Sequence, residues 1–164
     1  LKEPALRNPL EPNAKLPIKE LAERRLCKIY GRLMQRGEAI TEQSPAEALH
    51  EVRKTCKKLH YLLEFFQSLY PEDQIKPLVK SLKVFQIVLG EFQDAEIQIQ
   101  ALKLFREEIL ANPVPADTVS AMDRLIQELG ARRHRARHDF IKQFTAFSQS
   151  ESHSVLDSLL ALKA

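Results

Sequence analysis

Apolar residues recur three and four positions apart over most of this chain, the spacing that places side chains on one face of an α-helix. Between positions 18 and 40 the apolar side consists of Ala22, Leu26, Ile29, Tyr30, Leu33 and Ile40. No segment shows the strict alternation that is typical of a half-buried strand. The pattern predicts an all-α fold, with long helices over residues 18–40, 46–69, 72–110 and 117–147.

Proline and glycine residues indicate where the predicted helices begin, end or bend. Pro45 lies at the start of the second helix, and the sequence ANPVPAD separates the third helix from the fourth. We expect the third helix to be interrupted or bent near Pro77 or Gly90, and the fourth to have a weak point at Gly130. Short connections between long helices predict an antiparallel four-helix bundle.

The two ends of the chain differ from its middle. The first 17 residues, LKEPALRNPLEPNAKLP, contain prolines at positions 4, 9, 12 and 17, which is typical of an extended linker. Because position 1 is leucine, we expect a fragment of a longer protein, in which residues 18–164 form the folded unit. Residues 154–163, SVLDSLLALK, have helical spacing and predict a short fifth helix.

Composition and cysteine content are consistent with one soluble domain. The chain has 164 residues, of which 44% are hydrophobic, enough for a buried core. Cys27 and Cys56 lie in helical patterns without CxxC spacing, so we expect reduced thiols in or near the core, with a disulfide or reactive pair as the alternative. No signal peptide or membrane-length apolar run is present, so we expect a cytoplasmic protein.

Charge patterning is more informative than net charge, which is only +3. In residues 50–61, HEVRKTCKKLHY, six cationic or hydrogen-bonding side chains fall within an arc of roughly 140° on one helix face. They are His50, Arg53, Lys54, Lys57, Lys58 and Tyr61. Neighbouring cations repel one another, so this strip favours a repeating anion as its partner. We expect His50 to donate to a phosphate in either protonation state.

Further basic strips lie on the other predicted helices. The first helix contributes Arg24, Arg25, Lys28, Arg32 and Arg36; the third contributes Lys76, Lys80 and Lys83; and the fourth contributes Arg132, Arg133, Arg135, Arg137 and Lys142. Exposure to solvent alone would explain any one of these basic strips, whereas the presence of four strips favours a polyanion as the partner. We expect Glu64 to bridge to Lys57, Lys58 or Arg53, and Asp94 to orient a basic side chain from a neighbouring helix.

The sequence shows no arrangement typical of catalysis. It has no Gly-rich phosphate loop, nucleophile elbow or pair of carboxylates in an acid/base arrangement, which predicts a protein that is not an enzyme and needs no cofactor or metal. His134 and His138 have metal-compatible spacing, but the surrounding cations disfavour a metal ion. Phosphohistidine or metal-dependent phosphate chemistry at His50 stays an alternative, as does nucleic-acid binding, although the exposed faces lack aromatic residues for stacking.

Two segments, ALHEVRKTCKKLHYLLEFF and KPLVKSLKVFQIVLGEFQDAEI, resemble the CHAD family, the conserved-histidine α-helical domains. The family pattern is approximately HxxRxxxKxxRYxxExF followed by QxxLGxxxD. This chain supplies His50, Arg53, Lys57, Tyr61, Glu64, Phe66, Gln86, Leu89, Gly90 and Asp94. His60 stands where the family usually has an arginine. The resemblance extends over roughly residues 19–147 and looks like the second of the family's two internal halves.

The resemblance implies two antiparallel helical bundles with a basic surface that binds inorganic polyphosphate, and in some relatives a location at polyphosphate granules. It also implies that a longer protein could carry a triphosphate-hydrolysing domain. The first half is absent from these 164 residues, so we expect an incomplete site, which a homodimer would complete by pairing equivalent faces. The predicted ligands are Arg24, Arg25, Lys28, Arg32, His50, Arg53, Lys54, Lys57, Lys58 and Tyr61, supported by Glu64 and Asp94.

Overall fold

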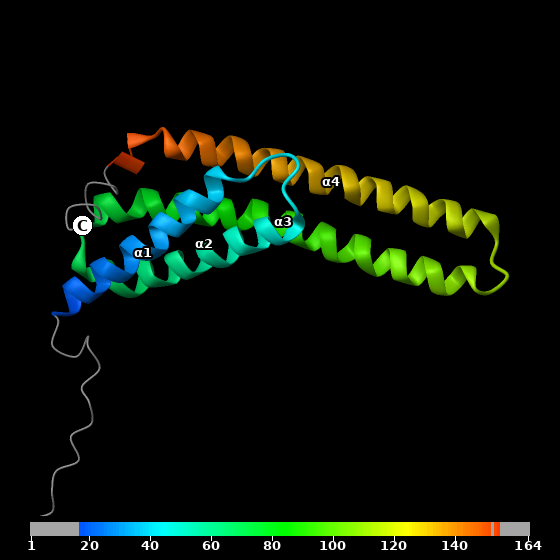
Figure 1. The fold of residues 1–164 in the computed structure, drawn as a ribbon, viewed down its shortest axis with the longest axis horizontal. Coiled ribbons are helices and arrows are strands. Elements are labelled where there is room, and N and C mark those ends of the chain that lie inside the picture. The colour runs from blue at the N-terminus through cyan, green and yellow to red at the C-terminus, as the bar shows by residue number, and fades with distance from the viewer. Residues whose placement is uncertain (1–16, 152, 155–164) are drawn as a thin grey trace, which may run out of the picture.

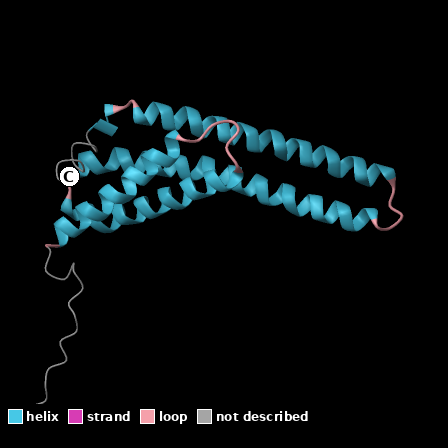
Figure 2. Ribbon diagram, viewed as in Figure 1, coloured by secondary structure: helices cyan, strands magenta, loops and turns pink. Residues whose placement is uncertain are grey.

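The computed structural model describes residues 17–151 and 153–154, and these residues form a bundle of long helices (Figures 1 and 2). In chain order they are α1 (Ile18–Glu38), α2 (Ala46–Phe66), the short 3-10 helix η1 (Gln67–Leu69), α3 (Glu72–Leu110) and α4 (Ala116–Ser148). No strand occurs in this part of the chain. The predicted all-α bundle is therefore confirmed.

The third helix is not interrupted, so of the two expected outcomes, an interruption or a bend, only the bend is left. All 39 residues of α3 are helical, and both Pro77 and Gly90 lie inside it. Pro77 lies in the second turn, where its missing N–H removes a single backbone hydrogen bond from a long helix. Gly90 is half-buried beside α2, so packing holds the backbone there. Helix α4 likewise continues through Gly130.

The four helices form two antiparallel hairpins of unequal length (Figure 1). The shorter hairpin, α1 and α2, packs against the part of the longer hairpin where α3 begins and α4 ends. The rest of α3 and α4 extends past α2, so Leu104 and Phe105 of α3 are 63% and 54% exposed. The molecule is thus four helices thick at one end and two at the other.

The core of the thick end is aromatic where α3 meets α4. Phe85 packs against Phe140, Phe144 and Phe147, with ring centroids 5.5 to 5.9 Å apart. These phenylalanines are buried, as expected of a core stripe rather than a surface for stacking bases. Helix α1 reaches α4 at Gly37, where an added Cβ would lie 2.2 Å from the Phe144 ring. Glycine at this position therefore allows the two helices to touch.

The cysteine prediction is confirmed: Cys56 is buried, Cys27 is half-buried, and neither forms a disulfide. Burial raises the pKa of Cys56 to about 12. None of the helices in the described ranges is long and apolar enough to span a membrane. The predicted linker, apart from Pro17, and the predicted fifth helix, apart from Ser154, lie outside the described residues.

Candidate functional site

Helix α2 lies between α1 and α3, so one of its sides contacts each neighbour and a third side faces outward. Toward α3, His50, Arg53 and His60 meet Gln93, Gly90 and Gln86 in turn. Positions that increase along α2 meet positions that decrease along α3, which shows that the two helices run antiparallel. The predicted strip therefore divides: Arg53 lies at the contact with α3, while the exposed Lys54, Lys58 and Tyr61 face outward.

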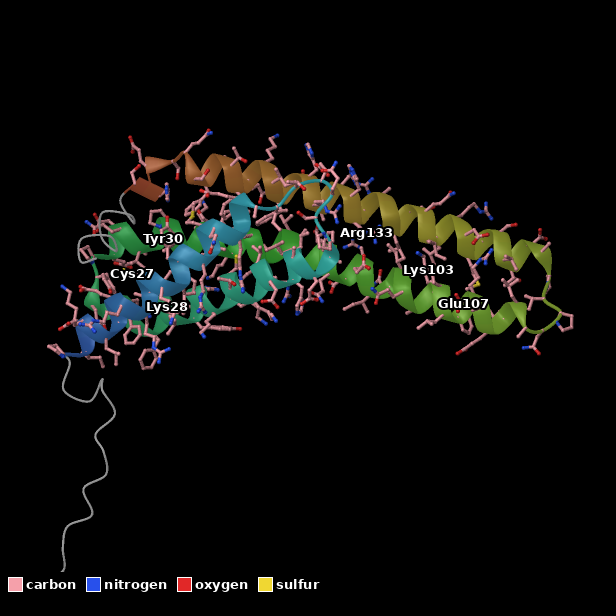
Figure 3. The ribbon with its side chains drawn as sticks, viewed as in Figure 1. Cys27, Lys28, Tyr30, Lys103, Glu107 and Arg133 are labelled. Atoms are coloured by element: carbon pink, nitrogen blue, oxygen red, sulfur yellow. The ribbon has the colours of Figure 1, made fainter. Side chains whose placement is uncertain are left out.

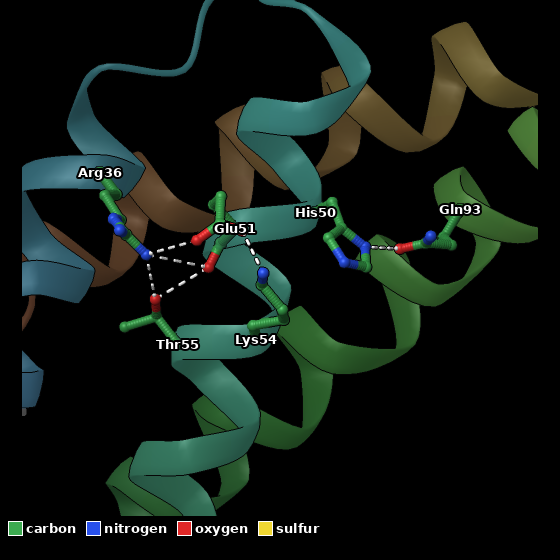
Figure 4. Close-up of polar contacts among 6 residues, drawn as sticks. All are labelled: Arg36, His50, Glu51, Lys54, Thr55 and Gln93. Atoms are coloured by element: carbon green, nitrogen blue, oxygen red, sulfur yellow. Dashed lines mark hydrogen bonds and ion pairs between the residues drawn. The ribbon is translucent and has the colours of Figure 1, made fainter.

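His50 is half-buried and held by α3 (Figure 4). Its Nδ1 lies 2.5 Å from Oε1 of Gln93, and because that oxygen accepts, Nδ1 donates. Only Nε2 is left for a ligand, and it donates only when the ring is protonated. The role of His50 as a donor to phosphate stays a prediction. Beside it lies a small pocket of about 250 Å³, lined only by residues of α2 and α3.

Arg53 lies against the backbone of α3. Its Nη2 is 3.7 Å and its Nε 3.9 Å from the position a Cβ would take on Gly90. The Nε atom is buried and has no hydrogen-bond partner in the part of the chain that the structure describes. Arg53 and Gly90, two motif residues 37 positions apart in the sequence, thus pack directly against each other.

His60 and Glu64 pair with each other rather than with the lysines. Nδ1 of His60 lies 2.9 Å from Nε2 of Gln86, and Nε2 of His60 faces Oε1 of Glu64 at 3.0 Å. His60 is only 8% exposed, whereas Glu64 is exposed. The expected bridge from Glu64 to Lys57, Lys58 or Arg53 is therefore not formed, because Glu64 lies one helical turn after the histidine on the α3 side of α2.

The predicted cations of α1 do not all point the same way. By helical geometry, at about 100° per residue, Arg25, Arg32 and Arg36 lie within roughly 40° of one another on the side of α1 that borders α2. Arg24 lies about 100° away from Arg25 and pairs with Glu20 at 2.8 Å. Arg24 is thus turned away from α2, and Lys28 lies between the two directions.

Arg36 is the α1 residue that reaches α2, and the predicted ligands did not include it (Figure 4). Its Nη1 donates to Oγ1 of Thr55 at 3.0 Å and to Oε2 of Glu51 at 3.2 Å. Glu51 also pairs with Lys54. A hydrogen bond from Lys54 is the main reason that the pKa of Glu51 is lowered, with the charge of Arg36 adding to it. In the sequence, the feature that could have predicted this cluster is Glu51, an acidic residue within a basic strip.

The remaining predicted cationic ligands are not neutralised by any carboxylate of the described residues. Six cations form no ion pair within the described ranges: Arg25, Lys28, Arg32, Arg53, Lys57 and Lys58. Asp94 is exposed and pairs with no residue that the structure describes, so its supporting role stays a prediction. The surface over α1 and α2 thus combines tethered side chains, such as Arg36 and Lys54, with cations that a bound anion would neutralise.

Comparison with known proteins identifies a family. The model of the CHAD domain matches residues 1–103 of this chain. The match includes α1, α2 and the part of α3 that contacts α2, and it ends before α4. It also takes in the first 17 residues, for which the sequence predicts a linker. No curated protein matches the chain.

Proposed function

The chain belongs to the CHAD domain family, and on this basis we propose that it binds inorganic polyphosphate without catalysis. The binding surface would extend over the outward side of α2, from its border with α3 at His50 and Arg53 to the neighbouring edge of α1. The observation that carries the proposal is the group of six cations that have no ion-pair partner among the described residues. A chain of phosphates would supply those partners as a series of charge-assisted hydrogen bonds.

The tethered residues would give this surface its shape. Arg53 rests against Gly90, and Arg36 is bonded to Thr55 and Glu51, so both side chains are held before a ligand arrives. Lys57, Lys58 and Arg32 are less restrained and would follow the anion. His50 would add a donor from Nε2 when it is protonated. This division favours the recognition of a repeating charge over that of one defined small molecule.

Titration of long-chain polyphosphate at several salt concentrations tests the proposal. If about five phosphates are neutralised, the affinity should fall steeply with salt, by analogy with counterion release from nucleic acids. The double variant Arg53→Ala, Lys57→Ala should bind at least tenfold more weakly. The matched control is Arg132→Ala, Lys142→Ala, which removes two exposed cations from α4. Absence of binding at low salt, or equal losses in both double variants, would refute the proposal.

Two measurements separate polyphosphate binding from the alternatives. Polyphosphate should displace labelled DNA or RNA far better than either displaces polyphosphate; the reverse order would favour a nucleic-acid-binding surface. Incubation with radiolabelled polyphosphate and divalent metal should release no phosphate and label no protein. A signal that depends on His50 would indicate an enzyme instead. Location at polyphosphate granules in cells is part of the same proposal.

A further inference from the structure

A larger cavity lies at the opposite end of α2 from His50. It has a volume of about 680 Å³ and is lined by the end of α2, by η1 and by the beginning of α3. Pockets of roughly 300–1,000 Å³ are the usual size for small-molecule sites. The buried residues Leu63 and Ile75, together with Val79, form an apolar part of its lining. None of the ten predicted polyphosphate ligands lines this cavity, although the supporting residue Glu64 and the basic strip of the third helix do.

Three lysines of α3 line the same cavity. Lys76, Lys80 and Lys83 are all exposed and follow one another at one-turn spacing. The Lys76 ammonium pairs with Glu72 at 2.7 Å. Lys80 and Lys83 form no ion pair within the described part of the chain.

Neither acidic residue of the lining pairs with Lys80 or Lys83. Glu72 holds Lys76, and Glu64 faces the His60 ring at 3.0 Å. Two ammonium groups are therefore left over beside an apolar surface. An isolated anion such as inorganic phosphate would satisfy the lysines but leave the apolar lining in water, and a neutral apolar molecule would do the opposite.

We propose that this cavity binds a small amphiphilic anion, a molecule with a phosphate or carboxylate head and an apolar body. The head would lie between Lys80 and Lys83, and the body would cover Leu63, Ile75 and Val79. Burial of apolar surface is favourable in proportion to the area removed from water, so even a short alkyl chain should add measurably to the attraction of the head. The site is separate from the proposed polyphosphate surface and does not rest on it.

Isothermal titration calorimetry with octyl phosphate, below its micelle concentration, tests the proposal on the full chain. Octyl phosphate should bind at least tenfold more tightly than inorganic phosphate and than 1-octanol, because neither satisfies both parts of the site. The variant Lys80→Glu, Lys83→Glu should reduce the affinity for octyl phosphate at least tenfold. Lys103→Glu, on the exposed surface of the same helix, should not (Figure 3). Circular dichroism establishes that each variant is folded.

Three results would overturn the proposal. The first is equal affinity for octyl phosphate and inorganic phosphate, which would indicate a simple anion contact. The second is unchanged octyl phosphate binding in Lys80→Glu, Lys83→Glu, which would place the ligand elsewhere. The third is loss of that binding in Arg53→Ala, Lys57→Ala, which would show that the ligand occupies the polyphosphate surface. If polyphosphate fails to bind while octyl phosphate behaves as expected, only the proposed function is refuted.

Discussion

The guanidinium of Arg53 lies directly over Gly90, with Nη2 3.7 Å and Nε 3.9 Å from the position that a glycine Cβ would occupy. The arginine belongs to α2 and the glycine to α3, so the contact joins the two segments of the family motif. A larger side chain at position 90 would occupy the space in which the guanidinium lies. The neighbouring guanidinium thus limits how large a side chain position 90 can hold, and the glycine's own backbone imposes no such limit, since no glycine in the described residues has a positive φ.

Replacement of Gly90 by leucine should weaken polyphosphate binding without unfolding the chain. The leucine side chain would displace the Arg53 guanidinium from α3, and hydrogen bonds to charged groups contribute about 1.5–3 kcal/mol each. We therefore expect a loss of affinity of roughly tenfold or more in the polyphosphate titration, together with an unchanged helical circular dichroism spectrum.

Gly90→Ala is the control for this prediction. Its Cβ would be in ordinary van der Waals contact with Arg53, and alanine in place of glycine inside a helix stabilises by up to about 1 kcal/mol. Binding should be unchanged, and the free energy of unfolding should rise slightly. If alanine weakens binding as much as leucine does, then the position of Arg53 is not the cause.

Replacement of Gly37 by alanine should destabilise the bundle. The added Cβ would lie 2.2 Å from the Phe144 ring, which is packed against Phe85 and Phe140 and has little room to move. Overpacking of this kind costs about 1–3 kcal/mol, which exceeds the gain in helix propensity. Urea unfolding measures the difference. Gly31→Ala, where an added Cβ has no atom within 4 Å, should instead be neutral or stabilising.

Thiol reactivity should report the burial of the two cysteines. Burial raises the pKa of Cys56 to about 12, so almost no thiolate is present at about pH 8. Burial, followed by the charge of Glu23, also raises the pKa of Cys27. In the variant Cys27→Ser, Ellman's reagent should modify Cys56 only as fast as the chain unfolds. Rapid modification in the absence of urea would contradict its place in the core.

The stability of the bundle should depend on pH through Glu96, which pairs with Arg133 of α4. Burial alone would raise the pKa of Glu96, but hydrogen bonds from Arg133 and Gln100 outweigh it, so the pKa lies below its ordinary value of 4.5. A lowered pKa means that the folded state favours the carboxylate. The stabilisation is therefore complete above the unfolded-state pKa and is lost as the pH falls through the folded-state pKa.

Urea unfolding of the wild-type chain and of Glu96→Gln, at several values between about pH 7 and pH 3, tests this dependence. The difference in unfolding free energy should be largest near neutral pH and should shrink in acid. A difference that is constant over the whole range would show that the ion pair with Arg133 does not stabilise the fold.

The bundle was predictable from the sequence because the apolar spacing is repeated in every helix. An interruption of α3 near Pro77 or Gly90 was one of two expected outcomes and was not found, since local propensity cannot show that a position is held by a neighbouring helix. The removal of one backbone hydrogen bond at Pro77 is a small loss in a helix whose buried side extends from Ile75 to Ile99. Tertiary packing thus decided what the sequence pattern left open.

For the candidate site, residue spacing identified a basic side of α2 but not its partners. The contacts of His50 with Gln93 and of His60 with Gln86 join positions 43 and 26 residues apart, so no local pattern could reveal them. Arg36 was seen as one cation among five, because spacing alone cannot show which arginine of α1 lies next to Thr55. The sequence alone does not show which residue of one helix lies opposite which residue of the next.

The part of α3 and α4 that extends past α2 has a consequence for how the molecule opens. From Ala101 to Leu110, α3 continues for about 14 Å, at 1.5 Å per residue, and α4 is the one helix of the described residues that lies beside it. Backbone amides in this stretch should exchange their hydrogens through local fraying, whereas those beside Phe85 should exchange only when the whole chain unfolds. Hydrogen exchange should therefore divide one continuous helix into a labile half and a protected half.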